Sequence, residues 1–399
     1  MTAPLRNVGL ASAAPTLRRG ITLLMAVAAG LAVANVYYAQ PLLDAIGRDL
    51  EIGEATLGVV MAMTQVGYGL GLLLVAPLGD LVDRRRLILT QVLLTAIALG
   101  VVAVATSATV FLSAMSCVGI LAVVAQVIVA HAASLAAPGE QGKVVGIVTT
   151  GIVIGILLAR TAAGVLSDMF GWRAIYFASS IAGLAAATLL FVALPAQRVP
   201  NAQMSYTRLI TSVFALFAQM PILRVRATLA LFIFFTITVL LTPLVLPLTA
   251  PPFELSHTEV GLFGLAGAAG ALGASSAGRF ADRGLGERIT GVALMLMLLS
   301  WLPIALLPHS LWGLIVGIIV IDYALQAVHV TNQSLIYRDR PEARTRLASG
   351  YMIFYSIGCA AGSMLSTMTY ARFGWSGVCL LGASGSAAAL AFWAITRDR

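Results

Sequence analysis

Long apolar stretches recur along the whole chain, and short gaps between them hold almost all of its charge. Of its residues 60% are hydrophobic and only 10% are charged, whereas a soluble domain carries about a quarter charged residues. A stretch of about 20 apolar residues can cross a bilayer as a helix. Within hydrocarbon the backbone must satisfy its own hydrogen bonds, and long runs without strand-like alternation do so only as helices. The sequence therefore predicts an all-α membrane protein.

These stretches predict about 12 transmembrane helices. They are expected over residues 21–43, 56–78, 87–107, 109–136, 144–167, 174–195, 227–249, 259–277, 289–307, 311–335, 347–370 and 376–395. The longest hydrophilic gap divides them into two equal sets. We therefore expect a six-helix bundle over residues 1–195, a cytoplasmic linker over 196–226 and a second six-helix bundle over 227–399.

The basic residues predict the orientation of the chain. Cytoplasmic loops of membrane proteins are enriched in Lys and Arg. Most of the 24 Lys and Arg residues fall on the side that holds both termini, and the opposite loops hold only Arg48, Arg173 and Arg372. Both termini are therefore predicted to be cytoplasmic. Because these charges are spread along one membrane face, the net charge of +8 does not indicate a nucleic-acid-binding patch.

Three blocks of residues recur in the second half of the chain, in the same order and at nearly the same offset. Gly79, Asp83 and Arg84 recur as Gly278, Asp282 and Arg283; Gln126, Ser134 and Leu135 as Gln326, Ser334 and Leu335; Gly155 and Phe170-Gly171-Trp172 as Gly358 and Phe373-Gly374-Trp375. Equivalent blocks fall on the same predicted side of the membrane. The halves are therefore expected to be parallel repeats, which can rock around a site near the membrane midplane.

The loop from Gly79 to Arg86, which reads GDLVDRRR, and its copy from Gly278 resemble the signature loop of the major facilitator superfamily. The resemblance extends over nearly the whole chain. The segment NVYYAQP from Asn35 and the turn at Gly171 are similar to the drug:proton antiporter branch of bacterial inner-membrane proteins. The resemblance implies a multi-pass inner-membrane transporter that works by alternating access.

In this superfamily the signature loop acts as a cytoplasmic latch between the halves. The resemblance assigns that role to Gly79, Asp83, Arg84, Gly278, Asp282 and Arg283. Glycine would allow a helix end to approach its neighbour closely. The aspartates would cap or face a helix N-terminus. The alternative is that the neighbouring arginines only anchor the topology.

Arg160 and Asp322 are the charged side chains that lie inside predicted membrane helices, away from the helix ends. A charge at the membrane centre costs about 2.5–3.5 kcal/mol on insertion scales, so such residues usually have a function. Both are predicted at the same depth, which permits an ion pair across the halves. We hypothesise that Asp322 binds the proton and that Arg160 is its partner, because separating them would favour proton uptake. The alternative is a permanent structural bridge.

The tenth predicted helix carries a polar stripe. Asp322, Gln326, His329 and Gln333 share one face of it, and such a face should meet a water-filled cavity or another helix. His329 would either relay protons or form an ordinary hydrogen bond. Side chains expected to line the cavity, or to make ordinary interhelical hydrogen bonds, are Asn35, Tyr37, Tyr38, Gln40, Gln65, Tyr68, Gln126, Gln326 and Gln333.

The fifth predicted helix has a small-residue face formed by Gly151, Gly155, Ala159 and Gly164, which suits close helix contact. It resembles the antiporter motif of drug exporters, although Ala159-Arg160 replaces the expected Gly-Pro. This replacement leaves a transporter as the prediction and leaves the direction of transport open.

The leading functional hypothesis is a proton-coupled exporter of a small apolar or weakly polar molecule. A proton-coupled importer or facilitator for a neutral metabolite is the second. An integral-membrane enzyme is a remote third, since the chain has no HExxH, nucleophile elbow or P-loop. No cofactor, metal or nucleotide is expected. The expected partners are the substrate, protons and the lipid bilayer, and the oligomeric state stays open with a monomer as the default.

Overall fold

The computed structural model describes residues 19–137, 139–195, 205–268, 286–340 and 343–397. These residues form helices joined by turns and contain no strand, which confirms the predicted all-α class. The α-helices are α1 (Arg19–Ala34), α2 (Leu43–Asp49), α3 (Gly58–Leu74), α4 (Arg84–Val104), α5 (Ala108–Ala122), α6 (Val124–Leu135), α7 (Gln141–Phe170), α8 (Arg173–Ala193), α9 (Tyr206–Gln219), α10 (Pro221–Leu241), α11 (Val245–Thr249), α12 (His257–Leu262), α14 (Gly286–Leu299), α15 (Trp301–Ala305), α16 (Leu311–Asp339) and α17 (Arg344–Thr396). Short 3-10 helices are η1 (Gln40–Leu42), η2 (Glu54–Thr56), η3 (Ala76–Asp80) and η4 (Phe263–Gly267).

Nine helical segments in the described part of the chain are long and apolar enough to cross a membrane. α1, with 16 residues, is shorter, and the predicted span 259–277 extends beyond the described residues. α17 runs through the turn predicted between residues 370 and 376 and is interrupted there by Gly374, whose φ of 61° and ψ of −159° are not helical. The count of 12 helices and the orientation of the termini therefore stay predictions.

Polar side chains define the start of several helices. Asp83 accepts a hydrogen bond from the Arg85 N–H at the start of α4, over 2.8 Å. Ser256 and Glu259 form a reciprocal capping box at the start of α12. Such caps satisfy backbone N–H groups that have no partner in the first helical turn. The prediction that Asp83 caps a helix is confirmed.

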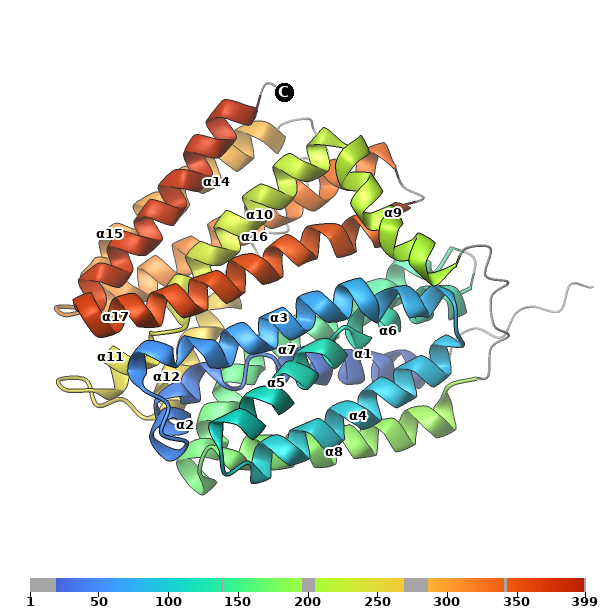
Figure 1. Ribbon diagram of the computed structural model, residues 1–399, viewed down its shortest axis with the longest axis horizontal. Helices are drawn as coiled ribbons and strands as arrows, with labels where there is room; N and C mark the ends of the chain where they lie inside the picture. The colour runs from blue at the N-terminus through green and yellow to red at the C-terminus, as the bar shows by residue number, and fades with distance from the viewer. Residues whose placement is uncertain (1–18, 138, 196–204, 269–285, 341–342, 398–399) are drawn as a thin grey trace, which may run out of the picture.

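Figure 1 shows the long helices in two groups that lie side by side. We call α1 and α3–α8 the first group, and α10 and α14–α17 the second group. α9 lies at one end of the molecule, which we call the α9 end. α2, α11 and α12 lie at the opposite end, the α12 end (Figure 1).

Small residues on α7 bring this helix close to its neighbours. A Cβ atom at Gly151 would collide with the carbonyl oxygen of Ala26 in α1, and Gly155 packs equally closely one turn further along. Towards the α12 end, Gly164 lies against the backbone of His257 in α12. The predicted small-residue face is thus confirmed as a site of close helix contact.

Direct hydrogen bonds at the α12 end join the first group to segments from the second half of the chain. The Gly58 N–H of α3 donates to Thr367 Oγ1 of α17 over 3.1 Å, and the Thr161 hydroxyl of α7 donates to the Gly261 carbonyl of α12 over 3.2 Å. One buried apolar core extends through both groups. A second core, between α1, α4, α6, α7 and α8, belongs to the first group alone.

Candidate functional site

Arg160 lies on α7, where that helix passes η1 and η4. Its Nε donates to Gln40 Oε1 over 2.6 Å, and its Cζ lies 5.3 Å from the centre of the Tyr37 ring. Gln40 is buried, while Arg160 and Tyr37 are half-buried. A hydrogen bond and an aromatic face both stabilise a guanidinium charge. Three side chains that the sequence singled out therefore meet at one point.

Asp322 on α16 and Arg160 approach the same segment, η4. A Cβ atom at Gly264 would lie 2.9 Å from Arg160 Cδ, and one at Gly267 would lie 3.3 Å from Asp322 Oδ2. The absence of side chains at these two glycines leaves room for both charged groups. Asp322 is therefore brought near Arg160, as the sequence predicted, although the two segments are far apart in the chain.

The two charges nevertheless form no direct ion pair in this structure. They are close enough to interact electrostatically. The Asp322 side chain is partly exposed, and within the described residues it has no hydrogen-bond or ion-pair partner. Gln40 takes the position beside the Arg160 guanidinium that we predicted for the carboxylate.

A pair of tyrosines connects the two groups of helices beside this site. The hydroxyl oxygens of Tyr37 and Tyr355 are 2.9 Å apart, and either hydroxyl can donate. The Tyr355 ring also lies edge-on to Tyr68, at 6.2 Å, and to Phe234, at 4.2 Å between centres. Tyr355 was not among the predicted site residues. Its position one helical turn from Tyr351, within an apolar stretch, is the signal that could have indicated it.

His329 shares the polar face of α16, but its contacts are to aromatic and amide groups. Its Nδ1 lies 2.9 Å from the Tyr351 hydroxyl, and its Nε2 lies 3.3 Å from Gln333 Nε2. The Phe234 ring packs edge-on against the imidazole, with centres 5.2 Å apart. These are the contacts of an ordinary hydrogen-bonded histidine, and the proton relay stays a prediction.

The remaining glutamines of the predicted cavity lie in different surroundings. Gln126 on α6 is exposed and lies beside the Tyr68 side chain, and Gln326 on α16 is partly exposed. Gln65 on α3 is buried, and its Oε1 has no partner within the described part of the chain. Because lipid cannot pair an amide, an exposed glutamine in an apolar helix indicates a polar or water-accessible space.

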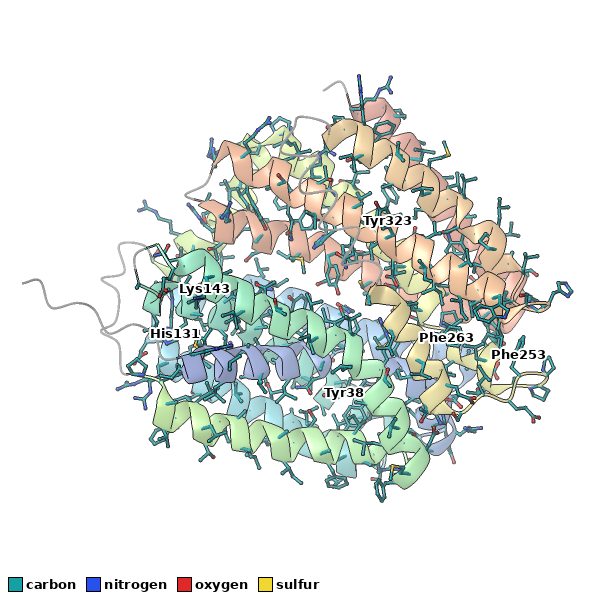
Figure 2. The ribbon with its side chains drawn as sticks, turned by 180° about the vertical axis from the view of Figure 1, so that it is seen from behind. Tyr38, His131, Lys143, Phe253, Phe263 and Tyr323 are labelled. Carbon is teal, nitrogen blue, oxygen red and sulfur yellow. The ribbon has the colours of Figure 1, made fainter. Side chains whose placement is uncertain are left out.

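Asn35 and Tyr38 point toward α8 and away from Arg160. The Ser179 hydroxyl donates to Asn35 Oδ1 over 2.7 Å and lies 3.5 Å from the Tyr38 hydroxyl. Figure 2 shows Tyr38 within the first group of helices. The contacts with Ser179 are ordinary interhelical hydrogen bonds, the alternative that the sequence left open for both residues. α1 ends at Ala34, and in the turn that follows Asn35 and Tyr38 face α8, whereas Tyr37 and Gln40 face Arg160 of α7.

The predicted latch residues bond mainly within the first group. Arg84 Nε donates to the Gly79 carbonyl over 2.8 Å and its Nη2 to Asp80 Oδ1 over 3.0 Å. The nearest neighbour of a Cβ atom at Gly79 would be Val127 Cγ1 at 3.7 Å, an ordinary van der Waals distance. The prediction that close packing requires glycine at position 79 was therefore wrong. Gly278, Asp282 and Arg283 lie outside the described residues.

At the α9 end, this loop faces the start of α17 and the linker helix α9. The Tyr206 hydroxyl of α9 donates to the Leu74 carbonyl over 2.7 Å. A cavity of about 20 Å³ is lined by Ala76, Pro77 and Asp80 of η3, Leu209 and Val213 of α9, and Thr345, Arg346 and Ser349 of α17. Asp80 and Arg346, which we did not predict as site residues, bring opposite charges to this boundary.

Comparison with known proteins identifies the family to which this arrangement belongs. Residues 23–341 and 227–399 match the sequence profile of the Major Facilitator Superfamily. The chain belongs to this superfamily. It is therefore a multi-pass membrane transporter and not an enzyme.

Individual relatives agree with this classification. The chain is 45% identical over 373 residues to the uncharacterized transporter YgaY of Escherichia coli O157:H7, covering 94% of each chain. It is 27% identical over 361 residues to a chloramphenicol resistance protein of Streptomyces lividans, covering 87% of this chain and 88% of that one. The structure matches a bacterial homolog of the human lysosomal transporter Spinster, in an inward-facing and unoccupied conformation, with a TM-score of 0.74. That match covers 96% of this chain and 95% of the other at 16% identity, and it shows the fold alone.

Proposed function

We propose that this protein is a proton-coupled secondary transporter that exports a small apolar or weakly polar compound by alternating access. The observation that carries the proposal is the approach of Arg160 and Asp322, from the two groups of helices, to the same segment η4. Charged side chains inside membrane helices usually mark ion or substrate pathways. If the two groups of helices rock against each other, the surroundings of Arg160 and Asp322 at their boundary would change in each transport cycle.

Asp322 is the proposed proton-binding group. Asp322 is partly exposed and has no hydrogen-bond partner within the described residues, and in this proposal it exchanges its proton with water. Arg160 is held by Gln40 and Tyr37 and acts as a fixed positive charge nearby. Moving α16 away from α7 would favour proton uptake by the carboxylate, and moving it back would favour release. His329, on the same face of α16, is the candidate relay.

The surroundings of this site support a small and weakly polar substrate. Tyr37, Tyr68, Phe234 and Tyr355 supply aromatic faces, and within the described residues Arg160 is the one arginine shown in contact with them. A multiply charged anion would need more than one such cation to offset its desolvation. The similarity to a chloramphenicol resistance protein supports export as the direction.

The proposal also includes an orientation. The basic residues support a cytoplasmic α9 end and an α12 end on the outer face of the bacterial inner membrane. The two halves, residues 1–195 and 227–399, would then rock about the linker 196–226, with the protein acting as a monomer. Asp83 and Arg84, with their copies Asp282 and Arg283 and the glycines at 79 and 278, are the proposed cytoplasmic latch.

The test is transport into inverted membrane vesicles, with chloramphenicol as the first probe and a panel of toxic compounds to follow. An imposed acidic interior should drive accumulation by the wild-type protein. Asp322→Asn should lose this accumulation, whereas Glu254→Gln, at an exposed loop carboxylate, should retain it. Accumulation by Asp322→Asn with unchanged pH dependence would contradict the coupling. Gradient-driven uptake in the opposite direction would instead support the importer.

A further inference from the structure

His257, the first residue of α12, lies between two carboxylates at the α12 end. Its Nε2 lies 3.0 Å from Asp44 Oδ1 of α2, and its Nδ1 lies 3.1 Å from Asp168 Oδ1 of α7. Both aspartates come from the first half of the chain, while His257 comes from the second. A single imidazole therefore joins the two halves at a point distinct from Arg160 and Asp322.

The two carboxylates are themselves held in place. The backbone N–H groups of His257 and Thr258 donate to Asp168 over 3.1 and 2.8 Å, and the Thr258 hydroxyl donates over 2.6 Å. Arg48 donates to Asp44 Oδ2 over 3.0 Å, and the Asp44 side chain is only 9% exposed. Neither carboxylate can move away from the imidazole without losing these other bonds.

Only the charged imidazole satisfies this arrangement. A neutral imidazole carries one N–H and one lone pair, whereas the imidazolium donates from both nitrogens. With an acidic oxygen at each nitrogen, deprotonation would point a lone pair at a carboxylate. The hydrogen bond to Asp44 is the main cause that raises the pKa of His257 above its ordinary value of 6.5, and burial opposes it.

The remaining charged groups near His257 do not change this conclusion. Arg48 pairs with Asp44 from its outer side, and its side chain is 74% exposed. Glu259, on the same helix as His257, turns back to accept from the Ser256 N–H over 2.8 Å. α12 also packs against η1, η4 and α11, which carry no charged residue, so Asp44 of α2 and Asp168 of α7 are the acidic groups that face the imidazole.

We propose that His257 is a second proton-binding site, and that its protonated form clamps the two halves together and keeps the α12 end closed. The closed arrangement raises the pKa of His257. Protonated His257 therefore stabilises this arrangement fully at pH values below the ordinary histidine pKa, and the stabilisation is lost as the pH rises through the raised pKa. An acidic medium at the α12 end therefore favours closure of that end. This site does not depend on proton binding at Asp322.

The test measures the distance between the halves at the α12 end by double electron–electron resonance. Nitroxide labels at Phe170→Cys and Phe373→Cys, both highly exposed positions at this end, report opening in lipid nanodiscs. The background carries Cys117→Ser, because Cys117 is an exposed free cysteine. We expect the long-distance population of the wild-type protein to grow as the pH is raised over about pH 5 to 8.

His257→Gln should abolish this pH response, and His257→Lys, whose charge persists over this range, should keep the short distance throughout. His309→Gln is the matched control, since His309 is an exposed histidine in the loop before α16. It should respond like the wild type, and so should Asp322→Asn. A response that survives in His257→Gln, or that disappears in Asp322→Asn, would overturn the proposal. Thermal melting of each variant separates loss of the clamp from loss of the fold.

Discussion

Arg160 and Asp322 reach the same glycine-containing segment η4, yet the structure holds them in different ways. Arg160 has an acceptor at 2.6 Å and an aromatic ring beneath its guanidinium. Asp322 has neither a hydrogen bond nor an ion pair within the described residues. An acceptor and an aromatic ring stabilise the charged form of Arg160, whereas the protonation of a carboxylate without a hydrogen bond depends on the charges and burial around it. The comparison suggests that the first half supplies a fixed charge and the second half a variable one.

The largest effect on transport is expected from removing the carboxylate of Asp322. Asp322→Asn should abolish accumulation against a gradient while leaving exchange of labelled for unlabelled substrate intact, because exchange needs no net proton transfer. Asp322→Glu, which retains a carboxylate, should restore part of the accumulation. Uptake and exchange in the same inverted vesicles measure both. Equal loss of exchange and accumulation in the Asn variant would show that Asp322 is structural.

A smaller effect is expected when Arg160 loses its hydrogen-bond acceptor. Gln40→Leu removes the acceptor of Arg160 Nε. Hydrogen bonds to charged groups contribute about 1.5–3 kcal/mol, so gradient-driven uptake should fall roughly tenfold or more. Gln91→Leu is the control, because Gln91 is buried on α4 and its amide has no partner within the described residues. If both variants lose transport equally, the bond to Arg160 has no special role.

The helix that carries Arg160 should also depend on its close contact with α1. Gly151→Ala places a methyl group against the Ala26 carbonyl, and such overpacking costs about 1–3 kcal/mol. The melting temperature and the transport rate should both decrease. Gly146→Ala, on the same helix with no atom within 4 Å of its Cβ, should be neutral or stabilise by about 0.8–1 kcal/mol. A Gly151 variant as stable as the Gly146 variant would contradict the packing that holds Arg160 in place.

The smallest effect is expected at the tyrosine pair between the two groups. Tyr355→Phe removes one of the hydroxyls that lie 2.9 Å apart, at a cost of about 0.5–1.5 kcal/mol. A double-mutant cycle with Tyr37→Phe, read out by the exchange rate and by thermal melting, measures the coupling. Strictly additive effects would show that the two hydroxyls do not interact in the working protein.

The amino-acid sequence alone determined the properties that depend on local composition. The length of the apolar stretches dictates membrane helices, and the cost of a charge in hydrocarbon identifies Arg160 and Asp322 without any knowledge of packing. The small-residue face of α7 is equally local, since four residues at helical spacing reveal it. The cap at Asp83 follows from its position before an apolar helix.

Only the tertiary structure decided how side chains from distant segments face each other. After the end of α1 at Ala34, Tyr37 and Gln40 face Arg160. Asn35 and Tyr38 instead face Ser179, and the residue types alone do not predict which of these side chains faces which helix. The hydrogen bonds of Tyr355 to Tyr37 and of His257 to Asp44 join residues that lie hundreds of positions apart in the chain. They form only because the two halves pack against each other. The wrong expectation at Gly79 has the same origin, because the space around a residue is a property of its neighbours. The chemical character of each side chain can be read from the sequence, whereas the distances between side chains of distant segments depend on how the helices pack.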